Sequence, residues 1–349
     1  MNVQQQQIML SIDSPSAAPL SILNWKALWT TAVVVLLTLS GCDNRSVPTT
    51  KQVHIGITQI ATHPGIDAIR KGFIDEMTRL GYQEGKNVTY DQSNAQGDMP
   101  IAQSIAQKLA QQRCDLIFAI STPSAQTVAQ TIKGSSIPLV FGAVTDPVSA
   151  GLVTSMEHPG GNITGTSDRW PVDKQFDLLI RLVPGVKKVG LVYNPGEANA
   201  EANLKVVEAV CLARNLEVVK VSVANTSEVQ TAAQSLIGRC EAMYVPADNT
   251  VIAAMQAVVK VSEQNRIPLL PGVSSNVEQG GFGTLGPDYY DVGVVSAEIA
   301  DQVLKGKKAG DIPVATAQRF EYFFNKRSAA ATGVVIPEDL LKKAAKIYE

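Results

Sequence analysis

From residue 53 onward, short apolar runs alternate with longer segments whose apolar residues recur every three or four positions. The run at 116–120 is wholly apolar, as expected for a buried strand, whereas 98–112 places Ile101, Ile105 and Leu109 on one face of a helix. The expected strands of this half are 53–60, 87–93, 116–120 and 137–142, and the expected helices are 64–81, 98–112 and 122 to about 134. Strands that alternate with helices over short connections predict a parallel, doubly wound sheet.

The pattern then starts again. Residues 188–192 resemble 54–58, and both halves enter a late strand through Ile-Pro-Leu, at 137–139 and at 267–269. In the second half we expect helix 196–215, strand 216–223, helix 226–239, strand 241–246, helix 248–265 and strand 267–271. The fold class is therefore α/β, with two similar Rossmann-like lobes and a binding cleft between them.

The remaining segments are expected to cross between the lobes. The Gly-rich passage 159–162 precedes a crossing strand at 164–167, and a helix is expected from 288 to about 304. An extended run at 318–325 and a C-terminal helix at 337–348 follow. The predicted division is 53–165 with 288–316 for lobe 1, and 166–287 with 317–349 for lobe 2.

The first 41 residues are not expected to belong to the fold. An apolar run at 27–39 has the length of a signal-peptide core and ends at Leu39-Ser40-Gly41-Cys42, which resembles a bacterial lipobox. We expect residues 1–41 to be a lipoprotein signal peptide, Cys42 to be lipidated, and 42–52 to be a tether. An ordinary signal peptide or membrane anchor with a chance cysteine is the alternative interpretation.

Composition narrows the class of protein. The chain has 349 residues, 45% of them hydrophobic and 18% charged, with a net charge of -2 and no basic cluster, so nucleic acid is not an expected partner. Three further cysteines, Cys114, Cys211 and Cys240, lack metal-site spacing and are interpreted as small buried residues. A bridge between Cys211 and Cys240 stays open at this point.

The candidate binding residues follow from the fold, because ligands of open parallel sheets sit beyond the carboxyl ends of the strands. Three helix starts are expected there: Thr122 as N-cap with Pro123 in the first helical position, Asp146-Pro147, and Asp248. Each could be a cap and nothing more. The polar residues at these strand ends are Thr58, Gln59, Ser121, Thr122, Thr145, Asp146, Asn194, Asp248, Asn249 and Ser274.

The charges of these residues indicate the type of ligand. Ser121 and Thr122 offer hydroxyls and helix N–H groups to a carboxylate, whereas Asp146 or Asp248 would hold an ammonium group. Together they suit the zwitterion of an α-amino acid.

Signatures of enzymes are mostly missing from the sequence. It has no HExxH, GxSxG or Walker A motif, and its one GxGxxG, at 281–286, lies in a predicted strand and precedes Pro287. We therefore expect no catalysis, no cofactor and no metal. His63 lies in a loop near the cleft and could touch the ligand, although a solvated loop histidine is the favoured interpretation.

Several motifs carry a family resemblance. HPGIDAIRKGFIDEM at 63–77, STPSAQ at 121–126, FGAVTDPVSAGLV at 141–153, LVYNPGEAN at 191–199 and GPDYYDVG at 286–293 resemble the tryptophan/tyrosine-type ABC transporter substrate-binding proteins. The resemblance implies a type I periplasmic-binding (Venus-flytrap) fold, three crossings, hinge closure on the ligand, and delivery to a permease driven by a separate ATPase. Two departures are the loop 271–276 and Trp170, which is expected to cover the hinge rather than contact the ligand.

The expected function combines these observations. The chain is interpreted as a lipid-anchored, extracytoplasmic, monomeric receptor that delivers a small polar solute, expected to be an aromatic or other amino acid, to an ABC importer. The alternatives are a periplasmic sensor that docks on a signalling membrane protein and, less favoured, an NAD(P)-binding enzyme.

Overall fold

The computed structural model of the chain describes residues 52–317 and 319–349, which belong to one compact unit, Thr50–Glu349. The predicted signal peptide 1–41, the lipidation site Cys42 and nearly all of the tether 42–52 lie outside the described residues. Within the described ranges, no helix is both long and apolar enough to cross a lipid bilayer.

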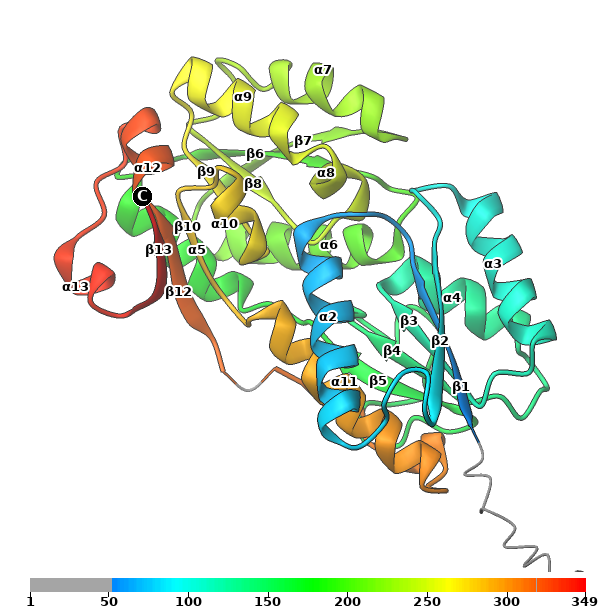
Figure 1. The fold of residues 1–349 in the computed structure, drawn as a ribbon. Helices are drawn as coiled ribbons and strands as arrows, with labels where there is room; N and C mark the ends of the chain where they lie inside the picture. Colours follow the sequence, from blue (N-terminus) through cyan, green and yellow to red (C-terminus); the bar gives the residue numbers. More distant parts are fainter. Residues whose placement is uncertain (1–51, 318) are drawn as a thin grey trace, which may run out of the picture. The chain divides into compact units, whose positions relative to one another are not determined.

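The first lobe contains a six-stranded parallel sheet in the order β11-β5-β4-β3-β1-β2 (Figure 1). Its strands are β1 (Val53–Gln59), β2 (Val88–Asn94), β3 (Leu116–Ile120), β4 (Leu139–Gly142), β5 (Ile163–Ser167) and β11 (Ala315–Thr316), and its helices are α2 (Pro64–Arg79), α3 (Met99–Gln111), α4 (Thr122–Thr131), α11 (Tyr289–Leu304) and the short 3-10 turn η2 (Ala309–Asp311).

The sheet of the first lobe is covered on both faces, which explains its wholly apolar central strand. In β3, Phe118 and Ile120 pack with α2, and the intervening Ala119 packs with α3 and α4. The Phe118 ring stacks on Phe73 of α2 with 4.0 Å between ring centroids.

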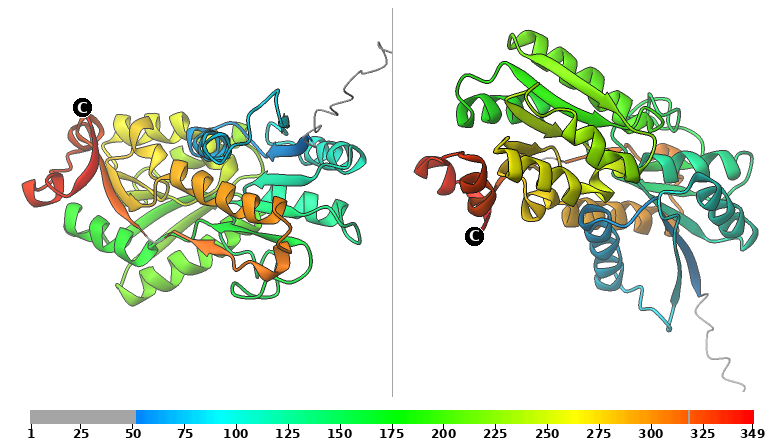
Figure 2. Two further views of the ribbon diagram at one scale, coloured as in Figure 1. Left: turned by 60° about the horizontal axis from the view of Figure 1, so that its bottom comes forward. Right: turned by 90° about the horizontal axis from the view of Figure 1, so that it is seen from above.

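Helices α2 and α11 lie side by side on one face of this sheet (Figure 1, Figure 2). They approach closely because Gly72 and Gly293 have no side chain at the contact. A Cβ added to Gly72 would lie 2.2 Å from the Tyr290 carbonyl oxygen, and one added to Gly293 would lie 2.1 Å from the Ile69 carbonyl oxygen.

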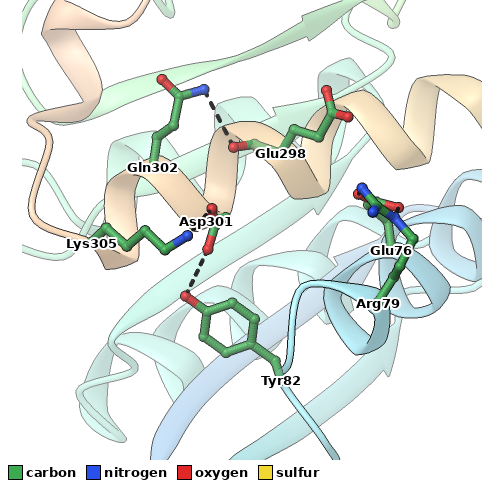
Figure 3. A network of polar contacts seen from close by, with 7 residues as sticks. All are labelled: Glu76, Arg79, Tyr82, Glu298, Asp301, Gln302 and Lys305. Atoms are coloured by element: carbon green, nitrogen blue, oxygen red, sulfur yellow. Dashed lines mark hydrogen bonds and ion pairs between the residues drawn. The ribbon is translucent and has the colours of Figure 1, made fainter.

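Polar contacts hold the outer ends of the same two helices (Figure 3). Tyr82, which follows α2, donates a hydrogen bond of 3.1 Å to the Asp301 carboxylate of α11, and the Lys305 ammonium lies 2.8 Å from that carboxylate. Glu76 and Arg79 form a separate ion pair within α2.

The second lobe repeats the arrangement with a four-stranded parallel sheet in the order β7-β6-β8-β9. Its elements are α5 (Val172–Leu182), β6 (Lys188–Tyr193), α6 (Ala198–Ala213), β7 (Glu217–Ser222), η1 (Thr226–Glu228), α7 (Val229–Gln234), β8 (Ala242–Val245), α8 (Asn249–Ala253), α9 (Met255–Asn265), β9 (Leu269–Pro271) and α10 (Ser275–Gln279). The four strands of this sheet have the same order as β2-β1-β3-β4 of the first lobe, and the predicted α/β fold class with parallel sheets is confirmed.

A three-stranded sheet beside β9 completes the second lobe, with the order β10-β12-β13. Its elements are β10 (Gly283–Gly286), β12 (Glu321–Asn325), α12 (Lys326–Thr332), α13 (Glu338–Leu341) and β13 (Ala344–Tyr348). The chain passes between the lobes after β5, after β10 and after β11. The exact residue division between the lobes stays a prediction.

The predicted C-terminal helix 337–348 is wrong. Only Glu338–Leu341 are helical, and Ala344–Tyr348 pair in parallel with β12. The neighbouring strand supplies hydrogen-bond partners that a local pattern does not show, and it overrides the helical pattern of Leu341 and the alanines.

Other helices begin, end or turn differently from the expectation. The predicted helix 248–265 is interrupted at Ala254, and the predicted helix 226–239 ends at Gln234. In α3, Leu109 is buried as predicted, but Ile101 is 45% exposed, and Ala102 and Ala106 face the core instead. Small alanines allow α3 to lie close to the sheet, which moves its buried face by one residue.

The three cysteines of the lobes are buried and free, so the bridge between Cys211 and Cys240 does not form. Burial raises the pKa of the Cys211 thiol to about 12 and that of the Cys240 thiol to about 11. These residues fill space in the cores, as the composition suggested.

Candidate functional site

Two cavities lie between the lobes. The outer cavity has a volume of about 1020 Å³ and is lined from both lobes by 60–62, 96–99, Pro123, Gln126, 194–197, 222–226, Glu228, Asn249, Thr250 and Ala253. The inner cavity has a volume of about 20 Å³ and is lined by His63, Ile66, Ile69, Ser121, Thr122, Ala143, Thr145, Asp168, Asn199, Ala247, Asn249, Ile252 and Tyr289.

Strand register explains why the first-lobe residues of the inner cavity meet. Ile120 of β3 lies beside Gly142 of β4, and Gly142 lies beside Thr166 of β5. The residues that follow these strands therefore leave the sheet at one edge, which brings Ser121, Ala143 and Asp168 together.

The junction of β3 with α4 presents hydrogen-bonding groups to the inner cavity. The N-cap is Ser121 and not Thr122, because the Ala125 N–H donates to the Ser121 carbonyl oxygen at 3.0 Å and starts the helix one residue early. The side-chain oxygens of Ser121, Thr122 and Ser124 are buried and have no hydrogen-bond partner among the described residues. Together with the free N–H groups of the first helical turn, they form a site for an anion.

The backbone at this junction is strained. Ser121 has φ 79° and ψ 161°, a region that is essentially reserved for glycine, and Ala143 at the end of β4 has φ 55°. Both residues line the inner cavity. Strain of about 1–3 kcal/mol per residue persists only where the surrounding structure imposes it, and it concentrates at functional sites.

Asp168, directly after β5, is the acidic group of the inner cavity. It is 2% exposed and accepts hydrogen bonds from the Thr145 hydroxyl at 3.1 Å and the Tyr289 hydroxyl at 2.5 Å. In the part of the chain that the structure describes, no lysine, arginine or histidine forms an ion pair with Asp168. Burial raises the pKa of its carboxyl above the ordinary value, although these hydrogen bonds lower it.

The two aspartates selected from the sequence lie elsewhere. Asp146 begins a turn rather than a helix, and it accepts hydrogen bonds from the Ser149 N–H at 3.0 Å and hydroxyl at 2.8 Å. Asp248 caps α8 as predicted, accepting from the Val251 N–H at 3.0 Å and the Asn194 N–H at 2.6 Å. Neither residue lines the inner or the outer cavity.

The other predicted site residues divide between the cavities and the core. Ser121, Thr122 and Thr145 line the inner cavity, Asn194 lines the outer one, and Asn249 lines both. Thr58, Gln59 and Ser274 are buried and line neither: the Gln59 amide donates to the Ala61 carbonyl oxygen, and the Ser274 hydroxyl donates to the Pro287 carbonyl oxygen.

His63 is buried, at 5% exposure, so its interpretation as a solvated loop residue is wrong. It is the N-cap of α2, and its Nδ1 accepts the Ile66 N–H at 3.4 Å. Burial lowers the pKa of the imidazole to about 4, against the smaller raising effects of Asn249, Asp67 and Glu197. The ring is therefore neutral at neutral pH.

The remaining walls of the inner cavity are mostly apolar. Ile66 and Ile69 come from α2, Ile252 comes from α8, and the Tyr289 ring comes from the start of α11. Trp170 does not line the cavity and packs behind Tyr289 with 5.3 Å between ring centroids, as expected for a residue that covers the crossings.

Sequence reasoning did not select Asp168, Tyr289 or Asn199 for the site. A polar residue directly after the crossing strand was the available signal for Asp168. Asn199 lies in the first turn of α6, several residues after the end of β6, so no rule about strand ends points to it.

Comparisons with known proteins agree with this architecture. Residues 54–348 match the family model described as "ABC transporter substrate binding protein". The chain is 42% identical over 289 residues to a tyrosine-binding protein of Clostridioides difficile (strain R20291), with 83% of each chain covered.

Two solved structures differ in how well they superpose. A Streptococcus pneumonia ABC domain in complex with L-Trp is 33% identical, with a TM-score of 0.82, over 85% of this chain and 100% of that one. The ligand-free, open structure of a Clostridium difficile substrate-binding protein with adhesive properties is 38% identical, with a TM-score of 0.65, over 85% and 99%. The chain thus superposes better on the ligand-bound relative, although that relative is less identical in sequence.

Proposed function

The chain belongs to the family of ABC transporter substrate-binding proteins, with a type I periplasmic-binding fold, and on this premise we propose that it captures an aromatic L-amino acid between its lobes. Such proteins are extracytoplasmic and work with an ABC transporter. The solute of this chain is inferred from the inner cavity, and the names of the two relatives that bind tyrosine and L-Trp support the inference.

The uncompensated carboxylate of Asp168 is the observation that carries the proposal. A buried charge without a partner is costly, and an arriving ammonium group would supply the missing cation. Thr145 and Tyr289 hold the carboxylate from the other side, through hydrogen bonds of 3.1 and 2.5 Å.

The α-carboxylate of the same solute would bind at the β3–α4 junction. The hydroxyls of Ser121 and Thr122 have no partner among the described residues, and the α4 N-terminus favours negative charge. An anion site and a cation site in one cavity match the two ends of a zwitterion.

The side chain of the solute would lie against the apolar wall of Ile66, Ile69 and Ile252. The Tyr289 ring adds a flat surface. Aromatic side chains contribute most when they fill such walls, because they bury a large apolar area.

Closure of the lobes is part of the proposed mechanism. The inner cavity of about 20 Å³ has room for about one water molecule and none for an amino acid. We therefore propose that the lobes part to admit the solute and then close on it less tightly than in the arrangement described here. The enclosed form is the one we propose to dock on the permease.

We also propose that the chain acts as a monomer on the periplasmic side of the inner membrane, held by a lipid on Cys42 after removal of residues 1–41. Metabolic labelling with a fatty acid tests the anchor, since labelling should disappear in Cys42→Ala. The alternative role, a sensor for a signalling membrane protein, predicts that the loaded protein activates a kinase and leaves the transport ATPase of a reconstituted permease unchanged.

Calorimetry on a panel of amino acids tests the ligand assignment. We expect Asp168→Asn to raise the Kd for the bound amino acid at least tenfold, since hydrogen bonds to charged groups contribute roughly 1.5–3 kcal/mol. Asp146→Asn is the matched variant, and we expect it to change the Kd less than twofold. The opposite result would assign the ammonium group to Asp146, and binding of no amino acid by the wild type would reject the ligand class.

A further inference from the structure

The protonation of His63 can be deduced from its surroundings. Its Nδ1 accepts the Ile66 N–H of α2, so Nδ1 carries no proton and the neutral ring bears its proton on Nε2. This Nε2–H is buried and has no hydrogen-bond partner of standard geometry among the described residues, although the Asn249 side chain raises the pKa of the ring through a hydrogen bond of poorer geometry. His63 lines the inner cavity, so this donor belongs to a residue of the cavity wall.

The orientation of the Asn199 amide is fixed in the same way. Its Nδ2 donates to the Glu197 carboxylate and to the Ala247 carbonyl oxygen, both at 2.9 Å, and both of these groups can only accept. Its Oδ1 is the opposite atom and has no partner in the part of the chain that the structure describes. Asn199 is 4% exposed and lines the inner cavity, so this buried acceptor also belongs to a residue of the cavity wall.

The donor and the acceptor come from different lobes and line the same cavity. His63 precedes α2 of the first lobe, and Asn199 lies in the first turn of α6 of the second. A group that satisfies both must accept one hydrogen bond and donate another, which is the property of a hydroxyl. A carboxylate only accepts, an ammonium group or an indole N–H only donates, and a phenyl ring does neither.

Resting on the proposed function, we propose that His63 and Asn199 recognise the phenol hydroxyl of the solute, so that tyrosine binds in preference to tryptophan and phenylalanine. The hydroxyl accepts from the His63 Nε2–H and donates to the Asn199 Oδ1. The zwitterion does not require either residue, because Ser121, Thr122 and Asp168 serve its two ends.

His63 and Asn199 would also disfavour the other aromatic amino acids. Phenylalanine would leave both the His63 donor and the Asn199 acceptor buried without partners, and tryptophan would leave the His63 donor unpaired. A site built to bind a hydroxyl discriminates strongly against an analogue that lacks it, because its own groups lose their partners. We expect tyrosine to bind at least tenfold more tightly than phenylalanine, with tryptophan between the two.

Two substitutions of His63 distinguish the roles of its two ring nitrogens. The carboxamide oxygen of His63→Asn can replace Nδ1 as the helix cap, but its side chain is too short to present the Nε2 donor. The longer His63→Gln places an amide N–H near the former Nε2. Isothermal titration calorimetry on the full-length chain with tyrosine and phenylalanine measures both variants, and thermal melts verify that both are folded.

We expect His63→Asn to weaken tyrosine about tenfold and to leave phenylalanine within twofold of the wild type, so that the preference is lost. His63→Gln should keep most of the preference. Equal weakening of the two solutes by His63→Asn, or equal wild-type affinities for them, would overturn the role of His63. If the wild type bound no aromatic amino acid, the proposed function itself would fail.

Discussion

Ser121 shows at the level of one residue how the site is formed. Its φ of 79° with ψ of 161° is a conformation that costs most residues about 1–3 kcal/mol, yet the chain uses serine there and not glycine. Serine adds a hydroxyl that glycine lacks, and this buried hydroxyl, like that of Thr122, has no partner among the described residues and belongs to a residue that lines the inner cavity.

Two substitutions of Ser121 distinguish the energetic cost of its backbone strain from the effect of its hydroxyl. Ser121→Gly and Ser121→Ala both remove the hydroxyl, but only glycine relieves the strain. Without solute, we expect Ser121→Gly to have a free energy of unfolding about 1 kcal/mol higher than Ser121→Ala, which is the strain minus the entropic cost of glycine. Urea unfolding measures the difference. Equal or reversed stabilities would show that the junction is not strained.

The same residue illustrates what could be predicted. The apolar run at 116–120 and the polar residues after it predicted the junction that lines the inner cavity, but the N-cap of α4 is Ser121 rather than Thr122, and strain at φ leaves no trace in the sequence. His63 was misjudged for a different reason. It is buried in the wall of a cavity that Asn199 and Asn249 of the second lobe also line, and a local pattern does not contain that proximity.

Among the elements, the helices α2 and α11 position two residues of the inner cavity. They carry His63 and Tyr289 at their starts, so their spacing fixes two walls of the inner cavity. Two glycines, Gly72 and Gly293, allow the close approach, and each faces a carbonyl oxygen of the opposite helix.

Gly293→Ala tests this contact. Alanine has a helix propensity about 1 kcal/mol better than glycine, but its Cβ would lie 2.1 Å from the Ile69 carbonyl oxygen. We expect a net destabilisation of about 1–3 kcal/mol, since backbone atoms must move. The control is Glu298→Ala on the exposed side of α11, which should change stability by less than about 0.5 kcal/mol. A more stable Gly293→Ala would refute the close contact.

Elements were predictable where their periodicity was long, as in α2, and where two halves repeated each other. The C-terminal segment was not, because β13 exists only through its pairing with β12. Asp168 was overlooked for a related reason. Its place in the site depends on β5 lying next to β4, which is a property of the sheet and not of the segment.

For the whole molecule, the residues proposed for binding also lie where the chain passes between the lobes. Asp168 follows β5 and Tyr289 begins α11, so both lie at connections between the lobes, and their hydrogen bond of 2.5 Å joins two of these connections. Trp170 packs directly behind Tyr289. A solute that binds Asp168 would therefore disturb the surroundings of the Trp170 indole.

Fluorescence can report this event. The chain has three tryptophans, and Trp25→Phe with Trp29→Phe leaves Trp170 as the single one. With excitation that tyrosine does not absorb, we expect tyrosine to change the Trp170 emission with the same Kd that calorimetry gives. The same variant carrying Asp168→Asn should show no change in emission at tyrosine concentrations near that Kd. Binding without any change in emission would show that the connections do not move with the solute.

The hydrogen bond between Asp168 and Tyr289 has a consequence for how such a receptor can change its cargo. The residue proposed to bind the ammonium group of the amino acid, Asp168, lies at a connection between the lobes, whereas the residues proposed to bind its side chain, His63 and Asn199, belong to the starts of α2 and α6. Substitutions at those two positions can therefore exchange one amino acid for another while the closing movement, and the surface that the membrane partner meets, stay as they are.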